Sequence, residues 1–166
     1  MSERKSTEVP GSYDLVVYPE YFQFYLQDAK EELDVAEEWQ DAEETFVVAT
    51  GKVLGVRTAR DQDTPVTIEI TDTEPDEDLL EWDHVVDCSI AIPSGELIVS
   101  GPTEDLYQAQ RIQVMPGIYA CRVYFGMLEE VDDDGFEGDD CYKVTLWPSG
   151  EQKPIKIRKS WIPNRG

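Results

Sequence analysis

The sequence predicts a mostly β protein that folds as an antiparallel β-sandwich, or as an open barrel, with one short acidic helix. Short runs in which apolar and polar residues alternate recur along the chain, and this period of two is typical of strands that bury one face. Turns rich in proline and glycine separate these runs at regular intervals. The length of 166 residues and the apolar fraction of 40% suit one hydrophobic core.

The expected elements follow one another along a single domain. Residues 1–11 are expected to form a flexible tail, residues 12–150 the sandwich domain, and residues 151–166 a basic tail or edge strand. Strands are expected at residues 21–28, 45–58, 65–72, 86–92, 96–100, 111–114, 118–127 and 141–147. The second of these contains Gly51 and Gly55, so we expect a bulge or a bend there. The helix is expected within residues 28–44, where the apolar side chains have helical spacing.

Negative charge dominates the composition. The chain has 36 Asp and Glu residues against 14 Lys and Arg residues, which gives a net charge of -22. Such a surface repels phosphate, so direct binding of nucleic acid and docking on an anionic membrane are both disfavoured. A basic protein is the favoured partner, because opposite charge accelerates association. The alternative is that acidity only keeps the protein soluble or reflects a salt-rich habitat.

Most of the acidic residues gather in three blocks that fall largely in connections between predicted strands. The second and third blocks contain the residues that we expect to bind a partner: Asp72, Glu74, Asp76, Glu77, Asp78, Asp132, Asp133, Asp134, Asp139 and Asp140. The segment from Glu151 onward is instead basic. This segment could therefore pair with the acidic loops of the same chain.

Catalytic and metal-binding signals are weak. His84 is the one histidine, and its expected role is that of a satisfied residue at a strand edge. The sequence contains no nucleophile elbow, phosphate-binding loop or dinucleotide fingerprint, and no cofactor is expected. The loop before Cys141 resembles the start of a calcium-binding loop, but Glu130 and Cys141 stand where that pattern needs Asp and Glu. If a divalent ion binds, the expected ligands are Asp132, Asp134, Asp139 and Asp140.

The cysteines and the N-terminus indicate a cytosolic protein. Cys88, Cys121 and Cys141 cannot all pair within one chain, and their spacing fits no zinc motif, so reduced thiols are expected. Residues 1–10 contain no apolar run, so we expect neither a signal peptide nor a membrane span.

Aromatic residues offer a second kind of site. Phe22, Phe24 and Leu26 are expected to face the core, which leaves Tyr21 and Tyr25 on the outer face. Trp147 is likewise expected on the outer face of its strand. Exposed Tyr and Trp side chains are common anchors in protein interfaces and in sugar sites. The alternative is that the acidic helix or the C-terminal tail covers this face.

Several segments together resemble the competence protein ComJ family. They are the Tyr21-Phe22-Gln23-Phe24 run that ends in Asp28, the Trp39 segment before a glycine-containing strand, the run from Ile112 through Pro116-Gly117 to Tyr119, and the acidic loop before Tyr142. The resemblance spans residues 21–146. It implies a small cytosolic inhibitor of a nuclease, or an immunity partner of a nuclease toxin, and it assigns no inhibitory residues.

The sequence therefore predicts a binding protein rather than an enzyme, one that inhibits or neutralises a basic protein, with a nuclease as the candidate. The rival interpretation is a sandwich module that binds a small ligand or carbohydrate through exposed aromatic residues. An acidic hydrolase is the third, since carboxylates are plentiful but the sequence marks none of them as buried.

Overall fold

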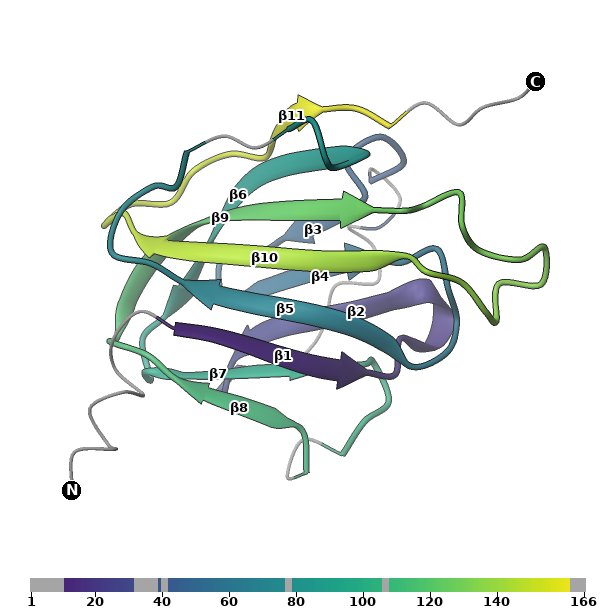
Figure 1. The fold of residues 1–166 in the computed structure, drawn as a ribbon. Coiled ribbons are helices and arrows are strands. Elements are labelled where there is room, and N and C mark those ends of the chain that lie inside the picture. Colours follow the sequence, from purple (N-terminus) through teal and green to yellow (C-terminus); the bar gives the residue numbers. More distant parts are fainter. Residues whose placement is uncertain (1–10, 32–38, 40–41, 77–78, 106–107, 162–166) are drawn as a thin grey trace.

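The alternating runs form two sheets that pack face to face, so the predicted β-sandwich is confirmed (Figure 1). The computed structural model describes residues 11–31, 39, 42–76, 79–105 and 108–161. The six-stranded sheet has the order β1 (Gly11–Val17), β5 (Thr64–Ile70), β10 (Cys141–Pro148), β9 (Gly117–Gly126), β6 (His84–Ile92) and β11 (Lys156–Lys159). The five-stranded sheet has the order β3 (Val47–Ala49), β4 (Val53–Arg57), β2 (Gln23–Asp28), β7 (Glu96–Ser100) and β8 (Gln110–Gln113).

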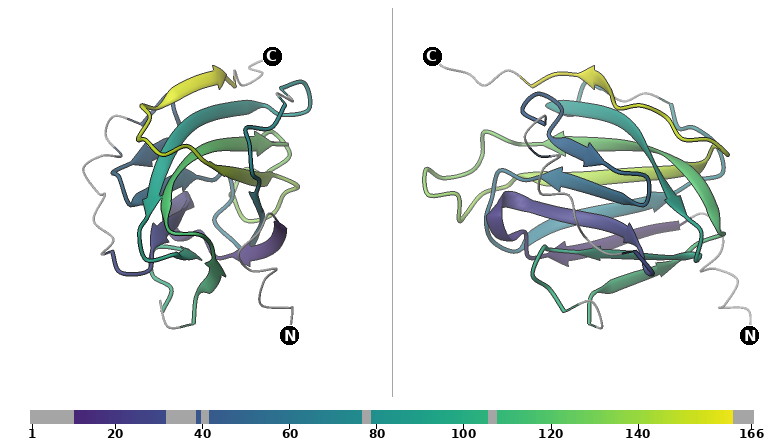
Figure 2. Two further views of the ribbon diagram at one scale, coloured as in Figure 1. Left: turned by 90° about the vertical axis from the view of Figure 1, so that its left-hand side faces the viewer. Right: turned by 180° about the vertical axis from the view of Figure 1, so that it is seen from behind.

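The hydrophobic core lies between the two sheets, whose layered arrangement is visible in the side and rear views of Figure 2. Phe24 and Leu54 project into it from the five-stranded sheet, and Ile68, Val123 and Val144 from the six-stranded sheet, all fully buried. Each such side chain contributes about 1.5–3 kcal/mol by leaving water. The core therefore holds the strand ends in fixed positions, and these ends carry the charged loops.

One pair of neighbouring strands departs from the antiparallel pattern. β10 runs parallel to β5, with Tyr142 opposite Val66 and Leu146 opposite Ile70, and antiparallel to β9 on its other side. Because β5 and β10 point the same way, the chain that follows β5 lies where β10 finishes. The backbone amide of Thr71 accordingly donates to the carbonyl of Leu146 at 2.9 Å.

The sequence prediction omits β1 and differs from the structure in the bounds of several strands, two of which matter here. β1 pairs with β5, and its alternating Tyr13, Leu15 and Val17 pack against the core. Residues 45–58 form a hairpin of β3 and β4 rather than one bent strand, because Gly51 has a φ of +88° and the chain reverses there. The strand predicted from residue 21 begins at Gln23, since a 3₁₀ turn, η1 (Glu20–Phe22), precedes it.

Parts of the prediction lie outside the described residues. The acidic helix expected within residues 28–44 falls largely on residues 32–38 and 40–41, and residues 1–10 of the expected tail are also outside. At the other end of the chain, β11 pairs with β6 at the edge of the six-stranded sheet. No helix among the described residues is long and apolar enough to cross a membrane.

Candidate functional site at the acidic end

Among the described residues, the loop between β9 and β10, residues 127–140, carries the densest group of exposed carboxylates, and it is here named the hairpin loop. It projects beyond the sheets at the right of Figure 1. Its exposed acids are Glu129, Glu130, Asp132, Asp133, Asp134, Glu137 and Asp139. Seven carboxylates on one loop produce a strongly negative local field, and this field attracts cations.

The hairpin loop is ordered by its own hydrogen bonds. Val131 and Gly138 form an isolated β-bridge across it. Oδ1 of Asp132 accepts the backbone N–H groups of Phe136 at 3.0 Å and of Glu137 at 3.3 Å. The bond from Phe136 is the main cause of a lowered pKa at Asp132, because it stabilises the ionised carboxylate. The carboxylates are therefore displayed on a defined backbone.

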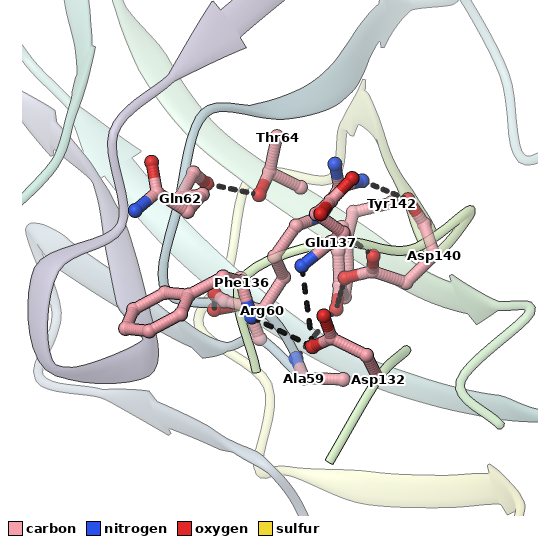
Figure 3. A network of polar contacts seen from close by, with 10 residues as sticks. Ala59, Arg60, Gln62, Thr64, Asp132, Phe136, Glu137, Asp140 and Tyr142 are labelled. Atoms are coloured by element: carbon pink, nitrogen blue, oxygen red, sulfur yellow. Dashed lines mark hydrogen bonds and ion pairs between the residues drawn. The ribbon is translucent and has the colours of Figure 1, made fainter. Parts of the chain in front are cut away.

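A buried polar network fastens the hairpin loop to the β4–β5 connection (Figure 3). Asp140 is fully buried, and its Oδ1 accepts the Nε–H of Arg60 at 2.8 Å. Its Oδ2 accepts the hydroxyl of Tyr142 at 2.6 Å, and the same tyrosine oxygen accepts the backbone N–H of Ala59 at 2.7 Å. Burial, followed by the nearby charge of Asp140, raises the pKa of Tyr142, so its hydroxyl stays protonated and donates.

This network corrects the prediction for Asp140. The sequence places Asp140 among the residues that contact a partner, yet its side chain is 0% exposed and already bonded to Arg60 and Tyr142. Its role in the structure is to anchor the loop. Asp132, Asp133, Asp134 and Asp139 remain exposed and available to a partner.

Exposed aromatic side chains lie beside the hairpin loop. The ring of Phe22 packs against Gly135, where an added Cβ would lie 3.0 Å from it, and the N–H of Phe22 donates to Asp61 at 3.4 Å. The sequence predicts Phe22 in the core, but this ring is 40% exposed, and Phe136 is 49% exposed. Tyr21, 71% exposed, and Phe22 both adopt a positive φ, of 61° and 62°, which is unfavourable for residues with large side chains.

The second predicted acidic segment, from Asp72 to Asp83, starts away from the hairpin loop and reaches it at its last residue, where the carboxylate of Asp83 accepts the N–H of Leu128 at 2.8 Å. It follows β5, so it begins at the opposite end of β10, a strand of eight residues that spans on the order of 20 Å. Asp72 and Asp76 are exposed there. Glu74 bonds to Arg122, and Glu77 and Asp78 lie outside the described residues.

Arg122 organises the outer face of the six-stranded sheet. Its guanidinium is fully buried and donates to Asp87 at 2.8 and 3.1 Å and to Glu74 at 2.8 Å. The bonds to Asp87 are the main cause of its raised pKa. Arg158 of the basic C-terminal segment also approaches Asp87, at 3.5 Å. The chain's own cations therefore neutralise part of the second acidic segment.

Two of the three aromatic surface candidates are buried, and the prediction of their exposure is wrong. Tyr25 is 3% exposed because Trp39 covers it, and the indole N–H of Trp39 donates to the Tyr25 hydroxyl at 2.7 Å. Trp147 is 8% exposed, beneath the C-terminal segment and 5.4 Å from the guanidinium of Arg122. Trp39 and the C-terminal segment thus cover these two side chains, which leaves Tyr21 as the exposed candidate.

The histidine and two of the cysteines lack the features of catalytic residues. His84 is buried, with Nε2 3.0 Å from the carbonyl of Thr45 and Nδ1 accepting the backbone N–H of Trp161 at 3.0 Å. Burial raises the pKa of the Cys121 thiol and of the Cys141 thiol, which makes both poor nucleophiles. Among the described residues, no group of three or more His, Cys, Asp or Glu side chains is placed to hold a metal ion.

Comparison with solved structures identifies the architecture. The structure of ComJ from Bacillus subtilis, described as an inhibitor of the DNA-degrading activity of NucA, matches with a TM-score of 0.64. The chain is similar in fold to ComJ. The match covers 85% of this chain and 99% of ComJ at 12% sequence identity. No family model and no curated protein matches the sequence.

A second solved structure has the same fold. Crocagin biosynthetic gene J matches with a TM-score of 0.56 and 14% identity, over 84% of this chain and 98% of that protein. At these identities the similarity establishes the fold, and the ComJ-like architecture is the part of the predicted resemblance that it confirms.

Proposed function

We propose that this protein binds and neutralises a basic protein through the carboxylates of the hairpin loop, with a nuclease as the class of partner. The observation that carries the proposal is the ordered array of exposed acids at one end of the sandwich, which includes Asp133, Asp134 and Asp139. The proposed action is binding in the cytosol rather than catalysis.

Charge complementarity supports a nuclease as partner. An enzyme that cleaves nucleic acid needs a basic groove for phosphate, and carboxylates held on a fixed loop can occupy that groove in place of phosphate. The net charge of -22 adds long-range attraction, which raises association rates by roughly 10- to 1,000-fold at low salt. ComJ, which has this fold, inhibits the DNA-degrading activity of NucA.

The rival function, binding of a small ligand through exposed aromatic residues, has little support. It requires Tyr21, Tyr25 and Trp147 to lie on the surface, and the last two are buried.

The test begins with capture of proteins from the native cell extract on the immobilised protein. We expect a basic protein to be retained at low salt and released at about 1 M salt, where the Debye length is about 3 Å. The captured protein is then assayed for DNA degradation with and without this protein. Absence of any basic protein with salt-sensitive retention would contradict the proposal.

A pair of matched variants locates the contact surface. The first carries Asp133→Asn, Asp134→Asn and Asp139→Asn in the hairpin loop, and the second carries Asp72→Asn, Asp76→Asn and Glu151→Gln at exposed positions away from it. Both lose the same charge, so non-specific attraction falls equally. We expect the first variant to lose binding and inhibition by at least about tenfold relative to the second. Equal losses in the two variants would show that no particular surface is used.

A further inference from the structure

A small cavity opens at the end of the sandwich that carries the hairpin loop, beside the base of that loop at Leu128. It has a volume of about 220 Å³ and is lined by Phe46, Arg57, Ala59, Phe125, Leu128 and Trp161, among others. We propose that this cavity, here named the aromatic socket, receives one large apolar side chain of the cationic partner. The inference rests on the proposed function and adds the chemistry by which the partner is recognised.

The walls of the socket are fixed before any partner arrives. The ring of Phe46 lies 5.8 Å from that of Phe125 and 6.2 Å from that of Trp161, edge to face in both cases. His84 lies beneath Phe46, at 4.4 Å between ring centroids, and its Nδ1 holds the backbone of Trp161. A preformed pocket saves the ordering cost that binding otherwise incurs.

The size of the socket fits a single side chain. A volume of 220 Å³ holds about seven water molecules at about 30 Å³ each. The volume lies below the range of about 300–1,000 Å³ that is usual for small-molecule sites. An occupant of about seven to ten non-hydrogen atoms, the size of a Phe or Trp side chain, is therefore the best match.

The charges around the socket determine which side chain enters and which stay outside. The guanidinium of Arg57, 5.7 Å from the ring centroid of Phe46, lies at the wall and repels a lysine or arginine inside. Just outside, the N–H of Leu128 bonds to the carboxylate of Asp83 at 2.8 Å, and the exposed Glu129 and Glu130 follow. The arrangement favours an apolar anchor surrounded by cations, the usual pattern of an interface hot spot and its rim.

A second copy of this chain is a poor occupant. Two molecules that each carry a net charge of -22 repel one another, most strongly where the hairpin loops would meet. The same carboxylates attract a cationic protein. The chemistry at this end therefore selects a basic partner over self-association.

Two synthetic peptides test the socket without knowledge of the natural partner. One has the sequence lysine–lysine–tryptophan–lysine–lysine, and the other has glycine in place of tryptophan. We expect the tryptophan peptide to bind about tenfold more tightly by calorimetry, because it alone buries a large apolar side chain. In NMR titrations of the unaltered protein, it should also shift the amide signals of Ala59 and Leu128, which line the socket.

The variant Ala59→Phe fills the socket without changing any charge. It should bind both peptides equally, at the affinity that the unaltered protein has for the glycine peptide. Equal affinity of the unaltered protein for both peptides, with shifts confined to residues 129–139 and none at Ala59 or Leu128, would overturn the socket while leaving the acidic surface intact. Failure of both peptides to bind would overturn the proposed function as well. If Ala59→Phe does not fold, the titrations of the unaltered protein with the two peptides test the socket by themselves.

Discussion

Replacement of Asp140 by alanine is the sharpest test of how the acidic end is held together. The carboxylate is fully buried and bonds to Arg60 at 2.8 Å and to the hydroxyl of Tyr142 at 2.6 Å. Removal of one partner of a buried ion pair costs about 3–5 kcal/mol, because the other charge is left without compensation. Arg60 is 13% exposed and regains little hydration, so we expect a loss near 4 kcal/mol, within the range of about 3–5 kcal/mol.

The assay is urea unfolding followed by fluorescence. With a slope of about 2 kcal/mol per molar urea, the midpoint of Asp140→Ala should fall by about 2 M. Addition of Arg60→Met removes the stranded cation, so the double variant should be more stable than Asp140→Ala alone by about 1 kcal/mol or more. A loss below about 1 kcal/mol for Asp140→Ala, at an unchanged slope, would refute the anchoring role.

Three further predictions concern other positions. Burial lowers the pKa of His84 below its ordinary value of 6.5, so the unfolded chain takes up a proton before the folded protein does. The free energy of unfolding should therefore fall as the pH drops below about 6.5. Urea unfolding from about pH 8 to about pH 5 should show this fall, and the variant His84→Gln should show a smaller one. Gly101→Ala places a Cβ 1.8 Å from the carbonyl oxygen of Tyr18 and should cost at least about 1–3 kcal/mol, whereas Gly11→Ala meets no atom closer than 3.5 Å and should change the thermal midpoint little. Tyr21→Gly should stabilise the protein by up to about 1 kcal/mol, because glycine accepts a φ of 61° and the exposed ring contributes little burial. Tyr21→Ala is the control, since it removes the same ring and keeps the Cβ. A loss of stability greater than about 1 kcal/mol in Tyr21→Gly would show that the backbone at Tyr21 is not strained.

The strain at Tyr21 and Phe22 bears on function as well as on stability. Unfavourable backbone conformations persist where the surrounding structure imposes them, and they concentrate at binding sites. Here the ring of Phe22 contacts Gly135 of the hairpin loop, and Tyr21 precedes it in the same turn. If Tyr21→Gly stabilises the fold and weakens the partner complex, the strained turn belongs to the interface.

The sequence by itself determined the fold class and most of the strands. Alternation such as that of Val66, Ile68 and Ile70 is a local property, because the pleat sends successive side chains to opposite faces whatever the strand pairs with. The acidity is likewise a sum over residues, and it disfavours nucleic acid and anionic membranes as partners wherever the individual carboxylates lie.

Only the tertiary structure decided which acids share a surface and which aromatic residues are covered. The parallel pairing of β5 with β10 sends Asp72 to one end of the sheet and Asp133 to the other. Asp140 is buried because Arg60, 80 residues away in the chain, reaches it, and Tyr25 is buried because Trp39 folds over it. Pairings between distant segments follow from the packing of the whole core, which no local pattern of residue types encodes.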